Sequence, residues 1–117
     1  LRVTELNGGA VHTVALPEAA YGVFPGGNAE YAAPAYRFTY SSLVTPPTVY
    51  DYDVRARRLD VRKRTEVPTY DASRYEVRRV SVPARDGTPV PVSVLMRRGT
   101  ALDGRSPMLL YAYGSYG

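Results

Sequence analysis

The sequence contains no cysteine, no tryptophan and no isoleucine, and it has a single lysine and a single histidine. Without cysteine the chain has neither a disulfide framework nor a thiolate site, which suits a reducing compartment. No run of residues approaches the roughly 20 apolar side chains that a membrane span needs. The chain does not begin with methionine, and no basic-then-apolar leader opens it. We therefore expect a piece of a longer cytoplasmic protein that has no membrane partner.

The sequence is instead rich in tyrosine and in glycine and proline, the residues that interrupt regular secondary structure. Glycine and proline occur 10 times each, and 11 tyrosines supply most of the aromatic area. A chain of 117 residues is long enough for one small domain, although its core would be thin. Short strand-like segments alternate with turn formers, and no segment has the apolar period of a long helix. The pattern predicts a mainly β fold.

The first residues of the chain predict a hairpin. Residues 2–6 and 11–16 flank Asn7-Gly8-Gly9, whose residue types tolerate the positive φ of a tight turn. Residues 17–34 are expected to form a loop with one short strand.

The clearest period of two follows. Tyr36, Phe38 and Tyr40 alternate with polar residues and are expected on one face of a strand. Residues 48–53 and 59–63 can pair as the next hairpin, and the three strands would form an antiparallel unit the size of most of one propeller blade.

A boundary is expected at residues 66–73, where Pro68, Asp71 and Ser73 interrupt the strand pattern. Beyond it, two strand-like segments, 75–82 and 90–96, are joined by a turn containing Asp86-Gly87. Residues 108–111 are more fully apolar and predict a buried strand. These three strands suggest the edge of a mixed sheet.

The net charge of +4 raises the question of nucleic-acid binding, because six basic residues cluster within a short stretch. They are Arg55, Arg57, Arg58, Arg62, Lys63 and Arg64. Acidic residues are interleaved with them, namely Asp51, Asp53, Asp60 and Glu66. Charges that alternate across a hairpin more often form a solvated face with cross-strand ion pairs. We predict that the chain has no nucleic-acid partner.

The last residues form an aromatic and glycine-rich loop after the apolar segment. Tyr111, Tyr113 and Tyr116 are either amphipathic packing residues or part of a site, because loops at strand ends often carry binding and catalytic groups. The pattern alone favours the packing interpretation.

Several motifs, in one order, resemble the oligopeptidase B branch of the prolyl oligopeptidase family of serine peptidases. They are Tyr40-Ser-Ser-Leu-Val-Thr-Pro-Pro-Thr-Val-Tyr50, Thr65-Glu-Val-Pro68, Ala84-Arg-Asp-Gly87, Val90-Pro-Val-Ser93 and Leu110-Tyr-Ala-Tyr-Gly-Ser-Tyr-Gly117. The resemblance is good from about residue 35 onward and weak before it.

The resemblance implies a seven-bladed β-propeller inserted into an α/β-hydrolase domain, with the active site between them. Residues 1–70 would then be the C-terminal part of the propeller, and residues 71–117 the start of the catalytic domain. The catalytic serine, aspartate and histidine would all lie downstream of this chain, in that order.

The resemblance also implies a role for Tyr113. In such enzymes the second tyrosine of a Tyr-Gly-Tyr-Gly motif donates its hydroxyl to the oxyanion of the tetrahedral intermediate, and Tyr113 occupies that position. Tyr111 is expected to be a packing residue, while Gly114 allows a sharp turn. Ala112 stands where the family usually has glycine, and its methyl group is tolerable if the backbone there is extended.

Other polar residues are not assigned to a site. Ser115 is expected to be a turn residue, because a hydrolase nucleophile needs the pattern Gly-x-Ser-x-Gly and Tyr113 occupies the first glycine position. His12 is expected to be packed or solvated. Asp51 and Asp53, at strand spacing without further oxygen ligands, are expected to be surface charges rather than a metal site. We predict neither a metal nor a cofactor.

The expected function of the intact protein is hydrolysis of short peptides, after arginine or lysine if it follows oligopeptidase B. The chain alone would be inactive because it lacks the triad. A prolyl-specific oligopeptidase and a non-catalytic β-rich binding module remain the alternatives. Leu102-Asp-Gly104 favours the prolyl branch, and Gly114-Ser-Tyr-Gly117 favours oligopeptidase B.

Overall fold

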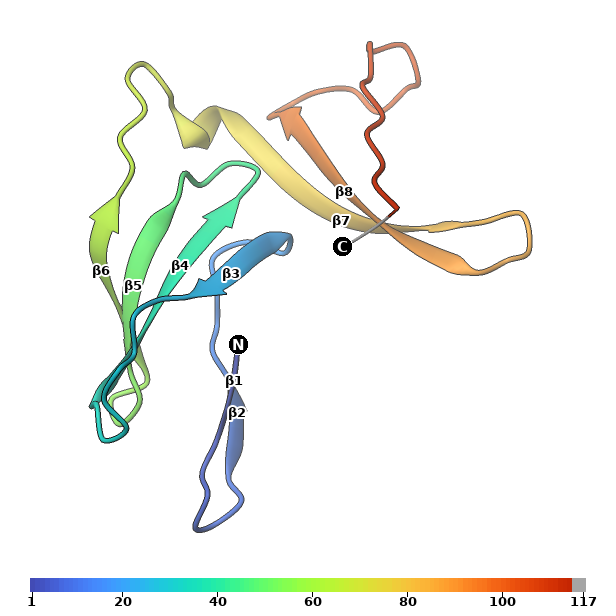
Figure 1. Ribbon diagram of the computed structural model, residues 1–117. Helices are drawn as coiled ribbons and strands as arrows, with labels where there is room; N and C mark the ends of the chain where they lie inside the picture. Colours follow the sequence, from blue (N-terminus) through green and yellow to red (C-terminus); the bar gives the residue numbers. More distant parts are fainter. Residues whose placement is uncertain (115–117) are drawn as a thin grey trace.

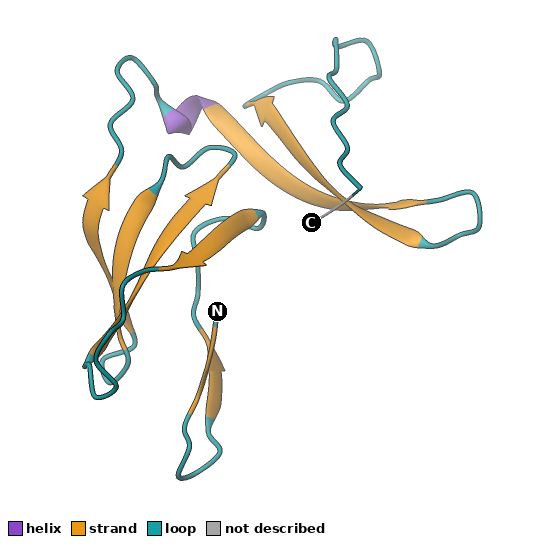
Figure 2. Ribbon diagram, viewed as in Figure 1, coloured by secondary structure: helices purple, strands orange, loops and turns teal. Residues whose placement is uncertain are grey.

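The computed structural model describes residues 1–114, in which eight strands form three separate antiparallel sheets (Figures 1 and 2). The elements are β1 (Arg2–Thr4), β2 (Val11–Thr13), β3 (Tyr21–Pro25), β4 (Ala35–Ser42), β5 (Thr48–Asp53), β6 (Arg58–Arg64), the 3-10 helix η1 (Ala72–Arg74), β7 (Tyr75–Pro83) and β8 (Pro89–Arg97). The predicted mainly β fold is confirmed. No helix within residues 1–114 is long and apolar enough to cross a bilayer.

The largest sheet has four strands in the order β3-β4-β5-β6. Strands β4 and β5 pair from Ala35 opposite Asp53 to Tyr40 opposite Thr48, so the alternating aromatics of both strands share one face. The three strands predicted between residues 36 and 63 are confirmed. The short strand expected within residues 17–34 is β3, which pairs with β4 and adds a fourth strand to the sheet.

The core of the chain is aromatic and lies on one face of β4 and β5. Phe38 and Tyr40 are 0% exposed, and Tyr50 and Tyr52 are also buried. The Phe38 and Tyr50 rings stack with centroids 5.8 Å apart, while Tyr40 meets Tyr50 edge-on at 5.9 Å. Both geometries are favourable for aromatic pairs and add to the gain from burying the ring area.

Two of the three core tyrosines, Tyr40 and Tyr52, have hydrogen-bonded hydroxyls. The Tyr52 hydroxyl lies 2.7 Å from His12 Nε2, and the Tyr40 hydroxyl donates to the Glu18 carboxylate. These bonds matter because a buried hydroxyl without a partner would cost free energy. The partners of these hydroxyls, His12 and Glu18, lie outside the four-stranded sheet. Their hydrogen bonds therefore also connect residues 12–18 to the core.

The β1–β2 hairpin covers the aromatic face of the sheet. Val14, directly after β2, is buried in the core cluster, and Leu1, Val3 and Leu16 pack against it. The hairpin predicted around Asn7-Gly8-Gly9 is confirmed with shorter strands than expected, and Gly9 has the positive φ (69°) that its turn requires.

The opposite face of the sheet carries charges. Arg37 on β4 donates two hydrogen bonds to Asp51 on β5, at 2.6 and 2.7 Å, and Arg62 on β6 lies 3.5 Å from the same carboxylate. The hydrogen bonds from Arg37 hold the pKa of Asp51 below its usual range. The cross-strand ion pairs predicted from the alternating charges are therefore present at Asp51.

Strands β7 and β8 form a long hairpin that extends away from the four-stranded sheet (Figure 1). The two strands pair from Tyr75 opposite Arg97 to Pro83 opposite Pro89, and Gly87 has φ 84° in the turn. This hairpin was predicted and is confirmed. The chain has a radius of gyration of 17.8 Å, above the value of about 13 Å for a compact domain of about 100 residues. The hairpin therefore does not share the aromatic core.

The buried strand predicted for residues 108–111 is wrong. These residues are irregular, and Met108, Leu109, Leu110 and Tyr111 are exposed. A strand needs a neighbour to satisfy its backbone donors and acceptors, and no strand within residues 1–114 pairs with this segment. The mixed sheet expected from this strand and the hairpin is consequently absent from the described residues.

The two phenylalanines of the chain allow a test of the core. We expect Phe38→Ala to lower the free energy of unfolding by about 3–5 kcal/mol, because it empties a ring-sized volume in a fully buried position. Phe24, which is 61% exposed, provides the matched control, and Phe24→Ala should change stability by only about 0.5 kcal/mol. Urea unfolding of the two variants measures both values. Equal losses would contradict a core centred on Phe38.

The Asp51 ion pairs predict a dependence of stability on pH. Because the folded-state pKa of Asp51 is lowered, its contribution is fully present above the unfolded pKa of about 3.9 and is lost as the pH falls through the folded value. Asp51→Asn should therefore lower the urea midpoint at pH 7, and its difference from wild type should shrink in acid. Asp103→Asn is the control, because Asp103 accepts a local backbone hydrogen bond from Arg105 (3.0 Å). A difference that is constant with pH would overturn the assignment.

Candidate functional site

The segment that carries Tyr113 follows the β7–β8 hairpin and begins with a turn. Arg105 N donates to the Asp103 carboxylate at 3.0 Å, and Gly104 has φ 78°, so the chain reverses before Met108. Beyond this turn the described residues run in an extended, unpaired course to Gly114. The candidate donor therefore lies on a segment whose position is not fixed by a ladder of hydrogen bonds.

Tyr113 itself is 67% exposed, and its hydroxyl makes no hydrogen bond to other described residues. Ala112 does not have a positive φ, since Arg57 and Thr69 are the non-glycine residues between 1 and 114 that do. The methyl group of Ala112 therefore causes no backbone strain of the kind that a positive φ would bring. The role of Tyr113 as an oxyanion donor stays a prediction, and Ser115 and Tyr116 lie outside the described residues.

His12 is packed against the sheet. Its Nε2 contacts the Tyr52 hydroxyl at 2.7 Å, and the two ring centroids are 6.0 Å apart. A half-buried cavity beside this pair is lined by Arg57 and Leu59. The histidine was expected to be packed or solvated, and it is packed. The sequence did not reveal its partner, which lies 40 residues away on another sheet.

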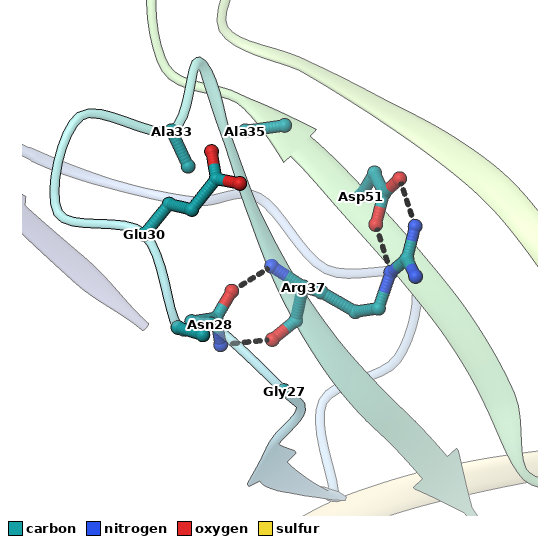
Figure 3. A pocket seen from close by; sticks show the side chains of 8 residues that line it. Gly27, Asn28, Glu30, Ala33, Ala35, Arg37 and Asp51 are labelled. Carbon is teal, nitrogen blue, oxygen red and sulfur yellow. Dashed lines mark hydrogen bonds and ion pairs between the residues drawn. The ribbon is translucent and has the colours of Figure 1, made fainter.

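A small cavity with both polar and apolar lining residues lies beside the charged face of the sheet (Figure 3). The Asn28 side chain accepts from Arg37 N at 2.7 Å and donates to Arg37 O at 2.9 Å, so it completes the end of β4 as a neighbouring strand would. Glu30 and Asp51 also line this cavity. Sequence reasoning missed Asn28; the signal was Gly26-Gly27-Asn28, a turn-forming run directly after β3.

Asp51 and Asp53 do not act together. Asp51 is engaged by Arg37 and Arg62, whereas Asp53 accepts hydrogen bonds from Arg55 N (2.9 Å) and Ala56 N (2.8 Å) in the β5–β6 turn. Each carboxylate therefore has a local structural role. No group of three or more potential metal ligands occurs in the part of the chain that the structure describes.

The basic cluster is partly neutralised. Arg58 donates two hydrogen bonds to Asp60, at 2.8 and 2.9 Å, and Arg62 lies beside Asp51. The structure thus intersperses anions among the basic residues of β6, which weakens the field that a polyanion would encounter.

Known proteins are similar to the whole chain, although no family model matches it. The dipeptidyl aminopeptidase BI of Pseudoxanthomonas mexicana is 42% identical over 100% of the chain. The prolyl endopeptidase of Elizabethkingia meningoseptica is 27% identical over 94% of it. The chain spans only 16% and 15% of the lengths of these two relatives.

The fold is similar to solved structures as well. Oligopeptidase B from Trypanosoma brucei, in a closed form with covalently bound antipain, superposes with a TM-score of 0.75 at 32% sequence identity. The superposition covers 92% of this chain and 16% of the oligopeptidase. Sequence similarity along the entire chain, a matching arrangement of strands and the motif around Tyr113 agree with one another, and the chain belongs to the prolyl oligopeptidase family of serine peptidases.

Proposed function

We propose that this chain is part of a serine peptidase that hydrolyses short peptides through an acyl-enzyme. The observation that carries the proposal is the similarity of the whole chain to peptidases, which reaches 42% identity. The activity belongs to a longer protein, because the chain corresponds to about a sixth of its relatives (16%).

Within that protein we assign residues 1–70 to the end of a β-propeller and residues 71–117 to the start of an α/β-hydrolase domain. The four-stranded antiparallel sheet β3–β6 has the strand number of one propeller blade, which supports the first assignment. The exposed apolar residues Met108, Leu109 and Leu110 support the second. Such a run is unfavourable in water and would gain both burial and hydrogen bonds as a strand inside a larger sheet.

The proposed chemistry assigns one step to this chain. A serine hydroxyl attacks the peptide carbonyl carbon, a histidine takes its proton, and the carbonyl oxygen becomes an oxyanion. The Tyr113 hydroxyl donates a hydrogen bond to that oxyanion. The tetrahedral intermediate then collapses to a serine ester and releases the amine, and water hydrolyses the ester. A fixed donor in a site that excludes water stabilises the developing charge more than solvent does.

The substrate preference has three candidates within the family. Motifs of the oligopeptidase B type support cleavage after arginine or lysine, and the Elizabethkingia relative is a prolyl endopeptidase. The 42% identity to a dipeptidyl aminopeptidase favours a third possibility, the removal of dipeptides from a free amino terminus. We propose cleavage after basic residues as the primary specificity, and dipeptide removal as the second candidate.

Tyr113→Phe in the intact peptidase should lower kcat about 100-fold to 1000-fold, because it removes one oxyanion donor. KM should change little, since the bond forms in the transition state. Tyr111→Phe is the matched control and should retain most of the activity. Steady-state kinetics on a short peptide provide the measurement, and an unchanged kcat for Tyr113→Phe would return this residue to a packing role.

Substrate specificity is tested with one short peptide containing an internal arginine at its second position, prepared with a free and with an acetylated amino terminus. Endopeptidase action after basic residues predicts cleavage of both forms. Cleavage of the free form alone, with release of a dipeptide, would support the second candidate instead. A version with proline in place of arginine should resist hydrolysis, and its preferential cleavage would overturn the proposed basic specificity.

A further inference from the structure

The segment from Thr65 onward is joined to the preceding residues by few polar contacts. Among residues 1–114, two hydrogen bonds cross this junction: Thr65 N donates to Pro47 O at 2.9 Å, and the Tyr70 hydroxyl donates to Val44 O at 2.7 Å. The first lies at the very start of the linker. The second is the one that fixes the linker near η1, where the β7–β8 hairpin begins (Figure 2).

The acceptor of this bond is held in place by the β4–β5 loop. The Ser42 hydroxyl accepts hydrogen bonds from Val44 N at 3.1 Å and Thr45 N at 2.9 Å. Ser42 N donates to Thr45 O at 3.0 Å, and the Thr45 hydroxyl donates to the Glu18 carboxylate. Val44 is itself buried. These hydrogen bonds within the loop hold the Val44 carbonyl in one orientation, independently of the Tyr70 hydroxyl that donates to it.

The donor is tied to the hairpin instead. The Tyr70 ring stacks on Tyr75, the first residue of β7, with centroids 5.8 Å apart and an interplanar angle of 22°. Partial burial raises the pKa of Tyr70, whose hydroxyl is in any case protonated and able to donate at neutral pH. Tyr70 N donates to Val67 O at 3.2 Å, and the intervening Thr69 has φ 65°, a conformation that β-branched residues rarely adopt.

The end of the hairpin is fastened to the same linker. Arg98 follows β8, and its backbone N donates to Arg74 O at 2.9 Å while its Nε donates to Ser73 O at 2.8 Å. Asp71 caps η1 through a hydrogen bond from Ser73 N at 2.9 Å. Tyr70, η1 and both ends of the hairpin thus form one connected unit.

Open spaces separate this unit from the sheet, and one of them, of about 340 Å³, lies between Ser93 of β8 and the residues around Tyr21 and Ser42. Another, of about 550 Å³, lies between the loop at Pro17–Ala19 and the start of β7, and it also contacts Val44. A third, of about 930 Å³, lies between the linker and the region of Pro46 and Arg64. Because the unit is not packed into the sheet at these places, a rotation of the hairpin would cost little core contact.

We propose that Tyr70 is a positioning residue that latches the β7–β8 hairpin to the four-stranded sheet through the Val44 carbonyl. The latch sets the angle between the sheet and the hairpin, and with it the position of the Tyr113 segment that follows. This inference concerns the conformation of the chain and does not depend on the proposed peptidase activity.

The latch is tested with spin labels, which the absence of natural cysteine makes simple. Arg55→Cys in the β5–β6 turn and Arg85→Cys in the hairpin turn place one label on each unit, and both residues are exposed. Labelled chain is diluted with unlabelled chain so that distances within one molecule are measured by pulsed electron spin resonance. Tyr70→Phe should broaden the distance distribution and lower the ratio of latched to unlatched molecules about 3-fold to 10-fold, as expected for the loss of one hydrogen bond.

Tyr75→Phe is the matched control, because it keeps the ring stack and removes a hydroxyl that makes no hydrogen bond within residues 1–114. Ser42→Ala, which loosens the loop holding Val44 without touching Tyr70, should broaden the distribution in the same direction. Identical distributions for Tyr70→Phe and Tyr75→Phe would overturn the proposal. Hydrogen exchange is measured alongside, and a loss of protection in β7 and β8 on Tyr70→Phe would also overturn it, since the residue would then hold the hairpin together rather than orient it.

Discussion

The aromatic face of β4 and β5 must be covered, and most of the first seventy residues are arranged around that requirement. Phe38, Tyr40, Tyr50 and Tyr52 place most of their ring area on one side of a single sheet. A sheet that exposed this area would lose the main favourable contribution to folding. The β1–β2 hairpin and the residues that follow it provide the cover through Val14 and its neighbours. The Tyr40 and Tyr52 hydroxyls add a second requirement, because a buried hydroxyl needs a polar partner, and Glu18 and His12 supply it.

The residues after Arg64 follow a different constraint. Their hairpin is held together by its own ladder and stays outside the aromatic core. This arrangement explains why the segment carrying Tyr113 is exposed although it is among the most apolar of the chain. The relatives are several times longer than this chain, and a contiguous exposed apolar segment is typical of a surface that contacts another part of a protein.

Particular residues show how far sequence reasoning reached. The alternation of Tyr36, Phe38 and Tyr40 predicted the buried face because a strand repeats every two residues. Asp86-Gly87 likewise predicted the β7–β8 turn from the conformations that these residue types tolerate. In contrast, the apolar character of residues 108–111 predicted a buried strand that the described residues do not contain. Apolar composition indicates the free energy that a segment would gain from burial. A strand forms only where a neighbouring strand supplies backbone hydrogen bonds.

By itself the sequence determined the positions of most strands and turns, the mainly β character and the resemblance to the prolyl oligopeptidase family. These properties depend on local periodicity, on the backbone preferences of glycine, proline, asparagine and aspartate, and on short motifs in a fixed order. Only the tertiary structure decided that β3 joins the sheet, that His12 caps Tyr52, that Asp51 pairs with Arg37 and Arg62, and that Tyr70 reaches Val44. Each of these contacts joins residues far apart in the chain, and no local pattern encodes which distant partner will fill a given space.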